Sequence, residues 1–317
     1  MPATLLNEER VAFVFPGQGS QYVGMGKHLY EASQAARTVF EKADETLGFC
    51  LSKLMFEGPG EELEDTINAQ PAVLTFSVAC LAALRERWQE LGRVVSPLYV
   101  AGHSLGEYTA LVAAGVLDFS DALRLVRERG RLMKETGQTR PGGMAAVVGL
   151  DRETLEQICQ EARLHGVIVL ANSNSPEQMV VSGELPALDV AVQLAREQGA
   201  KAVVPLRISI ASHSPLMQQA AIQLAELIAA LSMRDPVTPV VANIQGRILT
   251  TAEEIRDHLA DQLCRPVEWT RSVREMIESG VDTFVEIGPG QVLSRLITRI
   301  SRDVRALTVG DSEIDRL

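Results

Sequence analysis

The pentapeptide Gly102-His103-Ser104-Leu105-Gly106 constrains the fold of this chain more than any other feature of its sequence. The apolar run Pro97–Val100 before it predicts a short buried strand, and the helix-forming stretch 107–114 after it ends at Gly115. A serine between two glycines at a sharp strand-to-helix turn is typical of a nucleophile elbow, which exposes the serine hydroxyl above a sheet. The sequence therefore predicts an α/β fold in which Ser104 acts as a nucleophile.

The same residues allow a second interpretation. Ser104-Leu105-Gly106-Glu107 has the spacing of a helix-capping box, in which serine and glutamate only satisfy free backbone N–H groups. The predicted strand before the turn and the predicted helix after it favour the catalytic interpretation.

Length and composition limit the possible functions. A chain of 317 residues exceeds the usual size of one domain, and its formal net charge of −11 argues against nucleic acid or an anionic membrane as the main partner. The four cysteines are far apart and typical of reduced thiols rather than disulfides or metal ligands. Residues 1–10 do not resemble a signal peptide, and no apolar run approaches the length of a membrane span. We therefore expect a soluble, cytoplasmic protein.

The segment after the turn-rich residues 137–143 has its own order of elements. Strand, helix, strand, strand, helix and strand are predicted at 144–150, 151–166, 167–171, 178–181, 186–199 and 202–206. This order is that of the ferredoxin-like fold. We therefore predict a small domain of residues 137–207, inserted into a large domain of residues 1–136 and 208–317. Residues 311–317 are expected to form a frayed tail.

The helix predicted from about residue 122 to 135 carries one arginine on its apolar side. At about 100° per residue, Arg129 falls in the middle of the apolar half, opposite a basic face of Arg124, Arg127, Arg131 and Lys134. A guanidinium that faces the interior must be paired, because burying it bare would cost several kcal/mol. Two interpretations are open: a structural ion pair, or a site that binds a ligand carboxylate with two hydrogen bonds.

A serine nucleophile needs a base at neutral pH. Of the five histidines, His213 lies in an irregular loop bounded by serine and proline, where functional residues tend to occur. The side chain of His103 is expected to point away from that of Ser104, which favours a structural role. No carboxylate stands out as the third member of a triad.

Seven motifs, in family order over about residues 11–300, resemble those of the malonyl-CoA:acyl-carrier-protein transacylases. They are Pro16-Gly17-Gln18-Gly19-Ser20-Gln21, Gly102-His103-Ser104-Leu105-Gly106-Glu107, Arg129-Gly130-x-x-Met133, Asn172-x-Asn174-Ser175-Pro176, Ser212-His213-Ser214-Pro215-Leu216-Met217, Pro266-Val267-x-Trp269 and Glu286-Ile287-Gly288-Pro289-Gly290. The resemblance implies an α/β-hydrolase-like large domain with an inserted ferredoxin-like small domain.

The resemblance also assigns catalytic roles. It implies that Ser104 carries the acyl group and that His213 is its base. The backbone N–H groups of Gln18 and Leu105 would form the oxyanion hole. The backbone carbonyl of Gln262 would orient the histidine, which would explain the missing acid.

The implied substrate and mechanism follow from the same family. Arg129 would bind the free carboxylate of the malonyl group, as the helical-wheel position suggests. In a ping-pong reaction, Ser104 attacks malonyl-CoA, CoA leaves, and the phosphopantetheine thiol of acyl carrier protein takes up the malonyl group. No metal or redox cofactor is expected, and the resemblance suggests a monomer.

Alternatives to this function remain open. Ile210-Ala211-Ser212-His213 ends like the motif of methylmalonyl-type polyketide acyltransferases, whereas Leu105 resembles the malonyl enzymes, and malonyl is favoured. A trans-acting polyketide acyltransferase is a related possibility. A serine thioesterase or esterase would normally show a third acid and a glycine-rich oxyanion motif, and neither is evident. A non-catalytic binding module would be expected to have lost Ser104, His213 or Arg129.

Overall fold

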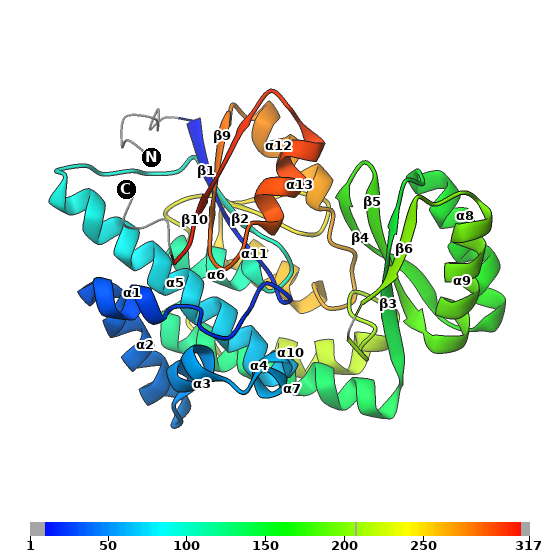
Figure 1. Cartoon of the computed structure of the whole chain (residues 1–317), viewed down its shortest axis with the longest axis horizontal. Helices are drawn as coiled ribbons and strands as arrows, with labels where there is room; N and C mark the ends of the chain where they lie inside the picture. The colour runs from blue at the N-terminus through cyan, green and yellow to red at the C-terminus, as the bar shows by residue number, and fades with distance from the viewer. Residues whose placement is uncertain (1–9, 207, 312–317) are drawn as a thin grey trace.

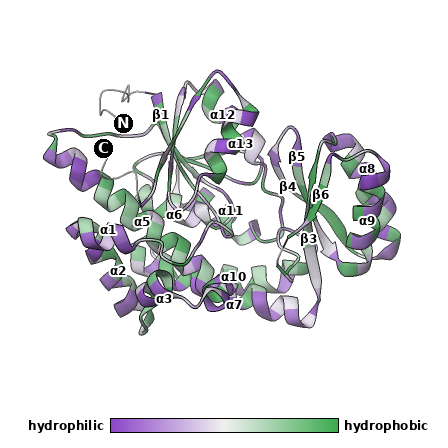
Figure 2. Cartoon of the chain, in the orientation of Figure 1, coloured by the Kyte–Doolittle hydropathy of each residue, from purple (hydrophilic) through white to green (hydrophobic). Residues whose placement is uncertain are grey.

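The computed structural model describes residues 10–206 and 208–311. Within these residues the strands form two separate sheets, each with helices packed against it (Figure 1). Strands of the large sheet are mostly hydrophobic, whereas many helices carry both hydrophilic and hydrophobic residues (Figure 2). Residues 312–317, most of the tail that the sequence predicts to be frayed, lie outside the described residues.

The large sheet has six strands in the order β10-β9-β1-β2-β7-β8. Their bounds are β1 Val11–Phe15, β2 Tyr99–Gly102, β7 Val240–Val241, β8 Ile248–Leu249, β9 Thr283–Ile287 and β10 Arg305–Val309. All neighbours are parallel except β7 and β8. Central β1 is buried on both faces, which suits a strand of apolar residues only. Phe15 pairs with Gly102, so β1 and β2 end side by side.

Helices cover both faces of the large sheet. Alternate residues of β1 point to opposite sides: Phe13 packs into the main core, and Ala12 packs with α12 and α13. The helices of this part are α1 Lys27–Ala32, α2 Gln34–Leu47, α3 Leu51–Glu57, α4 Gly60–Glu64, α5 Thr66–Glu90, α6 Gly106–Ala113, α7 Phe119–Thr139, α10 Gln218–Ala229, α11 Ala252–Asp261, α12 Trp269–Glu278 and α13 Val292–Ile300, with a short 3₁₀ turn at Pro215–Met217.

Helix α5 is the central helix of the main core. By length and composition it could cross a membrane, contrary to the expectation that no apolar stretch approaches the length of a membrane span. However, 78% of its most apolar window is buried inside the fold, so its hydrophobicity serves packing against neighbouring helices. Pro71 lies in the second turn of this helix, whose start is capped by the side chain of Asp65.

The second sheet is antiparallel, with strand order β4-β5-β3-β6. Its elements are β3 Gly142–Val148, α8 Arg152–Ala162, a 3₁₀ turn at Arg163–His165, β4 Ile168–Ser175, β5 Gln178–Glu184, α9 Leu185–Glu197 and β6 Ala202–Pro205. Both helices pack on one face of this sheet, on the side away from the large sheet (Figure 1).

Strand β4 joins the second sheet to the large part of the molecule. The sequence predicts that this strand ends at residue 171, but β4 continues to Ser175. The extension is stabilised because Val267 donates to the carbonyl of Ala171 at 2.8 Å and accepts from the N–H of Ser173 at 2.9 Å. Arg152 and Glu268 add a bidentate pair with both distances at 2.9 Å. The end of β4 is thereby held beside the segment that leads into α12.

Candidate active site

The turn between β2 and α6 is a tight elbow that only glycine allows. A Cβ on Gly102 would lie 1.9 Å from the carbonyl carbon of Gly106, and a Cβ on Gly106 would lie 2.0 Å from the carbonyl oxygen of Phe15. Ser104, at the tip, has a φ of 51°, in the left-handed region that side chains rarely adopt. The capping-box interpretation is wrong, because no side chain caps α6 and the Glu107 carboxylate is bonded elsewhere.

Ser104 and His213 form a hydrogen-bonded pair across 109 residues of sequence. Ser104 Oγ lies 2.8 Å from His213 Nε2. On the other side of the ring, Nδ1 lies 3.0 Å from the backbone carbonyl of Gln262 and 3.2 Å from that of Arg265. Carbonyl oxygens can only accept, so Nδ1 carries the proton and Nε2 is free to accept one from the serine hydroxyl.

The electrostatic environment keeps His213 neutral. Burial lowers the pKa of His213 to about 3, and the positive charge of Arg129 acts in the same direction. The carbonyls of Gln262 and Arg265 oppose this shift less strongly. A neutral imidazole beside a serine hydroxyl has the protonation state that a general base requires.

The lowered pKa of His213 predicts a pH-dependent stability. Between about pH 3 and the ordinary pKa of 6.5, His213 is protonated in the unfolded chain and neutral in the folded chain. The free energy of unfolding therefore decreases as the pH is lowered through this range. The loss is at most about 1.4 kcal/mol per pH unit. Urea unfolding of the natural protein and of His213→Gln between about pH 4 and 7 measures it. The variant should lose less stability on acidification, whereas parallel curves would contradict a neutral buried His213.

Arg129 lies inside the molecule, as its place on the predicted helix requires. It is 1% exposed, and burial lowers its pKa, although a guanidinium stays protonated in proteins. Nη1 donates to Gln70 Oε1 at 2.8 Å, and Nη2 lies 3.2 Å from both Ser104 Oγ and Gln262 Oε1. It forms no ion pair with a carboxylate in the described part of the chain, and its Nε has no hydrogen-bond partner there. The structural ion-pair interpretation is therefore wrong.

The loop after β1 lies against the elbow. A Cβ on Gly17 would lie 2.5 Å from the carbonyl oxygen of His103, so the loop of Gln18 approaches the turn that contains Leu105. The side chain of Gln18 accepts from Thr66, and Gln70 donates to Thr66 and accepts from Arg129. These bonds connect the side chain of Gln18 to the guanidinium through Thr66 and Gln70.

Sequence reasoning did not identify Asn243, which contacts the elbow although it lies far from it in the sequence. Asn243 accepts from the N–H of Ser104 at 2.6 Å and donates to the carbonyl of Gly102 at 2.5 Å. Asn174 lies 2.8 Å from Nε2 of His103, whose ring also contacts Trp269, which agrees with the structural role expected for His103. Asn243 follows a short apolar run, and a polar residue at the end of a predicted strand is the signal that would have identified it.

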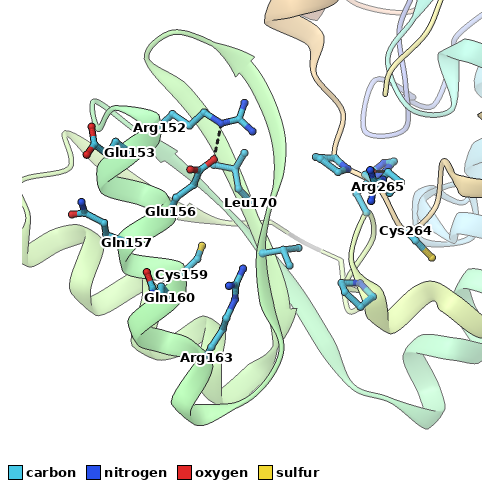
Figure 3. Close-up of a pocket in the computed structure, with 14 residues that line it drawn as sticks. Arg152, Glu153, Glu156, Gln157, Cys159, Gln160, Arg163, Leu170, Cys264 and Arg265 are labelled. Carbon is cyan, nitrogen blue, oxygen red and sulfur yellow. Dashed lines mark hydrogen bonds and ion pairs between the residues drawn. The ribbon is translucent and has the colours of Figure 1, made fainter. Parts of the chain in front are cut away.

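A cleft of about 580 Å³ leads to this site from the second sheet (Figure 3). Cys264 and Arg265 line it on one side, and Arg163 and residues of α8 line it on the other. His213 is also among the residues that line it. His213 is thus reachable from a cleft between the two parts of the molecule. Within the described residues, no group of three or more His, Cys, Asp or Glu side chains is placed to hold a metal ion.

Comparisons with known proteins agree with this geometry. The family model described as "Acyl transferase domain" matches residues 12–311. The malonyl CoA-acyl carrier protein transacylase of Bacillus subtilis (strain 168) is 46% identical over 96% of this chain and 94% of its own length. The Escherichia coli (strain K12) protein of the same name is 44% identical over 91% of this chain and 92% of its own length.

Solved structures give the same result. An acyl carrier protein S-malonyltransferase from Vibrio cholerae O1 biovar eltor superposes with a TM-score of 0.92 at 41% identity, covering 97% of this chain and 99% of that one. A malonyl-transacylase in complex with a type II polyketide synthase acyl-carrier protein superposes with a TM-score of 0.91 at 42% identity, covering 96% and 97%. The chain therefore belongs to the acyl transferase domain family and, within it, to the malonyl CoA-acyl carrier protein transacylases.

Proposed function

We propose that this protein transfers a malonyl group from malonyl-CoA to the phosphopantetheine thiol of acyl carrier protein. The observation that carries the proposal is the distance of 3.2 Å between Ser104 Oγ and Nη2 of Arg129. An acyl group bound to Ser104 would place its own atoms beside a buried cation that lacks an anionic partner. A carboxylate close to the reacting carbonyl fits this site, because Nε has no partner in the described part of the chain and Nη2 lies beside the acylated oxygen, so the two groups suit bidentate binding.

The reaction that we propose proceeds in two symmetrical halves. His213 takes the proton of Ser104 as the hydroxyl attacks the thioester carbonyl, and it returns the proton to the CoA sulfur as the C–S bond breaks. The backbone N–H groups of Gln18 and Leu105 stabilise the oxyanion of each tetrahedral intermediate. The thiol of the carrier protein then attacks the acyl-enzyme, and His213 again accepts and returns the proton.

We also propose that the large domain, residues 1–136 and 208–317, is α/β-hydrolase-like and that the small domain, residues 137–207, is ferredoxin-like. The elbow after β2 in a mainly parallel sheet supports the first assignment, and the order of elements around the antiparallel sheet supports the second. We expect the protein to act as a cytoplasmic monomer. We also expect no metal, and no redox cofactor because the acyl transfer changes no oxidation state.

Radiolabelled malonyl-CoA tests the function. The label should bind covalently, persist in water and leave when acyl carrier protein is added. Rapid release by water would indicate a thioesterase or esterase, and no labelling would indicate a binding module.

Intact-mass measurement after incubation with equal amounts of malonyl-, methylmalonyl- and acetyl-CoA identifies the preferred acyl group. A dominant methylmalonyl adduct would favour the methylmalonyl-specific alternative.

Two basic surfaces of this chain could dock an acidic carrier protein, one on α7 and one on and after α13. On α7, three of the four basic residues form ion pairs with nearby carboxylates, namely Arg124, Arg131 and Lys134. On and after α13, the exposed residues Arg295, Arg299 and Arg302 form no ion pair in the described part of the chain, and Arg299 contacts the neutral Gln178. We therefore propose that carrier protein docks at the α13 surface.

Docking through charge predicts a difference between the two half-reactions. Raising salt from about 0.05 to 0.5 M should weaken transfer to carrier protein more than acylation by malonyl-CoA, because exposed charges are screened most. Arg299→Ala should reduce the salt dependence of the transfer, and Arg124→Ala, on the paired surface, should not. Equal salt dependence of both half-reactions would contradict electrostatic docking.

A further inference from the structure

The side chain of Gln262 contacts Arg129, Ser104 and Glu107, and its backbone carbonyl contacts the imidazole of His213. Its Oε1 accepts from Nη2 of Arg129 at 3.2 Å. Its Nε2 donates to the backbone carbonyl of Ser104 at 3.0 Å and to Oε2 of Glu107 at 2.5 Å. Gln262 is fully buried, so water cannot replace any of these partners.

The orientation of this amide follows from the chemistry of its neighbours. A guanidinium can only donate hydrogen bonds and an ionised carboxylate can only accept them. Both oxygens of Glu107 accept in the structure, Oε1 from the backbone N–H of Asn243 at 3.0 Å and Oε2 from Gln262. Gln262 must therefore turn its NH₂ group toward Glu107 and its oxygen toward Arg129.

Glu107 is itself held firmly. It is 1% exposed and lies on the first turn of α6, next to the elbow. Nε2 of His258 lies 2.8 Å from Glu107 Oε1, in a geometry that does not make a hydrogen bond. The backbone N–H of Asn243 cannot turn away from the carboxylate, since the side chain of the same residue is bonded to Ser104 and Gly102.

We propose that Glu107 is a positioning residue for the malonyl-carboxylate subsite. It holds the amide of Gln262 in the one orientation that presents an oxygen to Arg129, and so directs Nη2 of the guanidinium toward the acyl group on Ser104. The inference rests on the function proposed above and adds a residue that acts on acyl-group selection without touching the substrate.

The isosteric substitution Glu107→Gln should reverse this arrangement. One carboxylate oxygen becomes an NH₂ group, and the remaining oxygen is required by the fixed N–H of Asn243. The new NH₂ then faces Gln262, whose amide is expected to flip and turn its own NH₂ toward Arg129. Two donors would oppose each other, and the guanidinium would lose a hydrogen bond.

Glu107→Gln should reduce the reaction with malonyl-CoA much more than the reaction with acetyl-CoA. Loss of one charge-assisted hydrogen bond is expected to reduce kcat/KM for malonyl-CoA by about 10- to 100-fold. Acylation by acetyl-CoA and labelling of Ser104 by a neutral sulfonyl fluoride should change little, because the backbone carbonyl of Gln262 still orients His213. The measured quantity is therefore the ratio of malonyl to acetyl kcat/KM.

Glu286→Gln is the matched control. Glu286 is fully buried, and both of its oxygens also accept hydrogen bonds, from Leu293 and Ser294 at the start of α13. The same substitution there should lower the melting temperature and leave the malonyl-to-acetyl ratio unchanged. Equal loss for both substrates in Glu107→Gln would show a merely structural role for Glu107 and overturn the inference.

A double-mutant cycle with Gln262→Met completes the test. It also provides a second variant in case Glu107→Gln folds poorly. Gln262→Met removes the amide and keeps the backbone carbonyl, so it should lower the malonyl-to-acetyl ratio by itself. Glu107→Gln should then cause no further change in this background, because Glu107 acts through the amide. Additive effects would overturn the inference.

If the natural protein forms no malonyl adduct, the proposed function fails; if it does and the ratio is unchanged in Glu107→Gln, only this inference fails.

Discussion

Replacing Ser104 with alanine should abolish the acyl-enzyme and lower malonyl transfer by several orders of magnitude, as removal of a catalytic nucleophile does. The hydroxyl at the tip of the elbow lies within 2.8 Å of His213 Nε2, and the strained turn aims it away from the sheet. No other group in the described site is placed to replace it. Intact-mass measurement after incubation with malonyl-CoA should show unmodified protein.

The fold should survive this substitution, since the elbow depends on Gly102, Gly106 and Asn243 rather than on the hydroxyl. Ser182→Ala is a suitable control, because that serine is fully buried on β5 and its hydroxyl has no partner among the described residues. The control should keep full activity. A covalent malonyl adduct in Ser104→Ala would exclude Ser104 as the nucleophile.

Replacing Arg129 with alanine should have the second largest effect and change which acyl group is transferred. A carboxylate held by two charge-assisted hydrogen bonds at a buried site has a truncation cost of roughly 2–5 kcal/mol. At about 1.4 kcal/mol per tenfold, malonyl transfer should fall by roughly 30- to 3,000-fold. Acetyl transfer should fall little or even rise, because the buried charge that disfavours neutral acyl groups is removed.

Rates for both substrates and the melting temperature should be measured together. Since Arg129 has no carboxylate partner in the described chain, its removal leaves no buried anion unpaired. Arg127→Ala on the same helix is the control; that side chain contacts Asn68 and Phe49 and should not affect acyl selection. Parallel losses of malonyl and acetyl transfer in Arg129→Ala would contradict the carboxylate role.

Local patterns explain which parts of the site could be predicted from the sequence. The glycines flanking Ser104 are required by contacts within the turn and with adjacent β1, so a pentapeptide is enough to indicate them. The inward position of Arg129 follows from the spacing of apolar residues along one helix. The first inference depends only on residues adjacent in sequence, and the second only on the regular geometry of one helix.

The remaining parts of the site depend on contacts between distant segments. Asn243 meets Ser104 across 139 residues, and Gln262 meets Glu107 across 155. No periodicity marks such pairs, so the sequence alone suggested a capping role for Glu107. The length of β4 was missed for the same reason, because its last residues are extended only through bonds to Val267.

The left-handed backbone of the active pair has a consequence for how this chain balances stability against activity. Ser104 and His213, with φ of 51° and 57°, are two of three non-glycine residues with positive φ in the described structure. Each such residue costs on the order of 1 kcal/mol, which glycine would recover. Selection for stability alone would therefore favour glycine at both positions. The backbone is strained at the active centre, so variants that have lost catalysis can become more stable by relieving this strain.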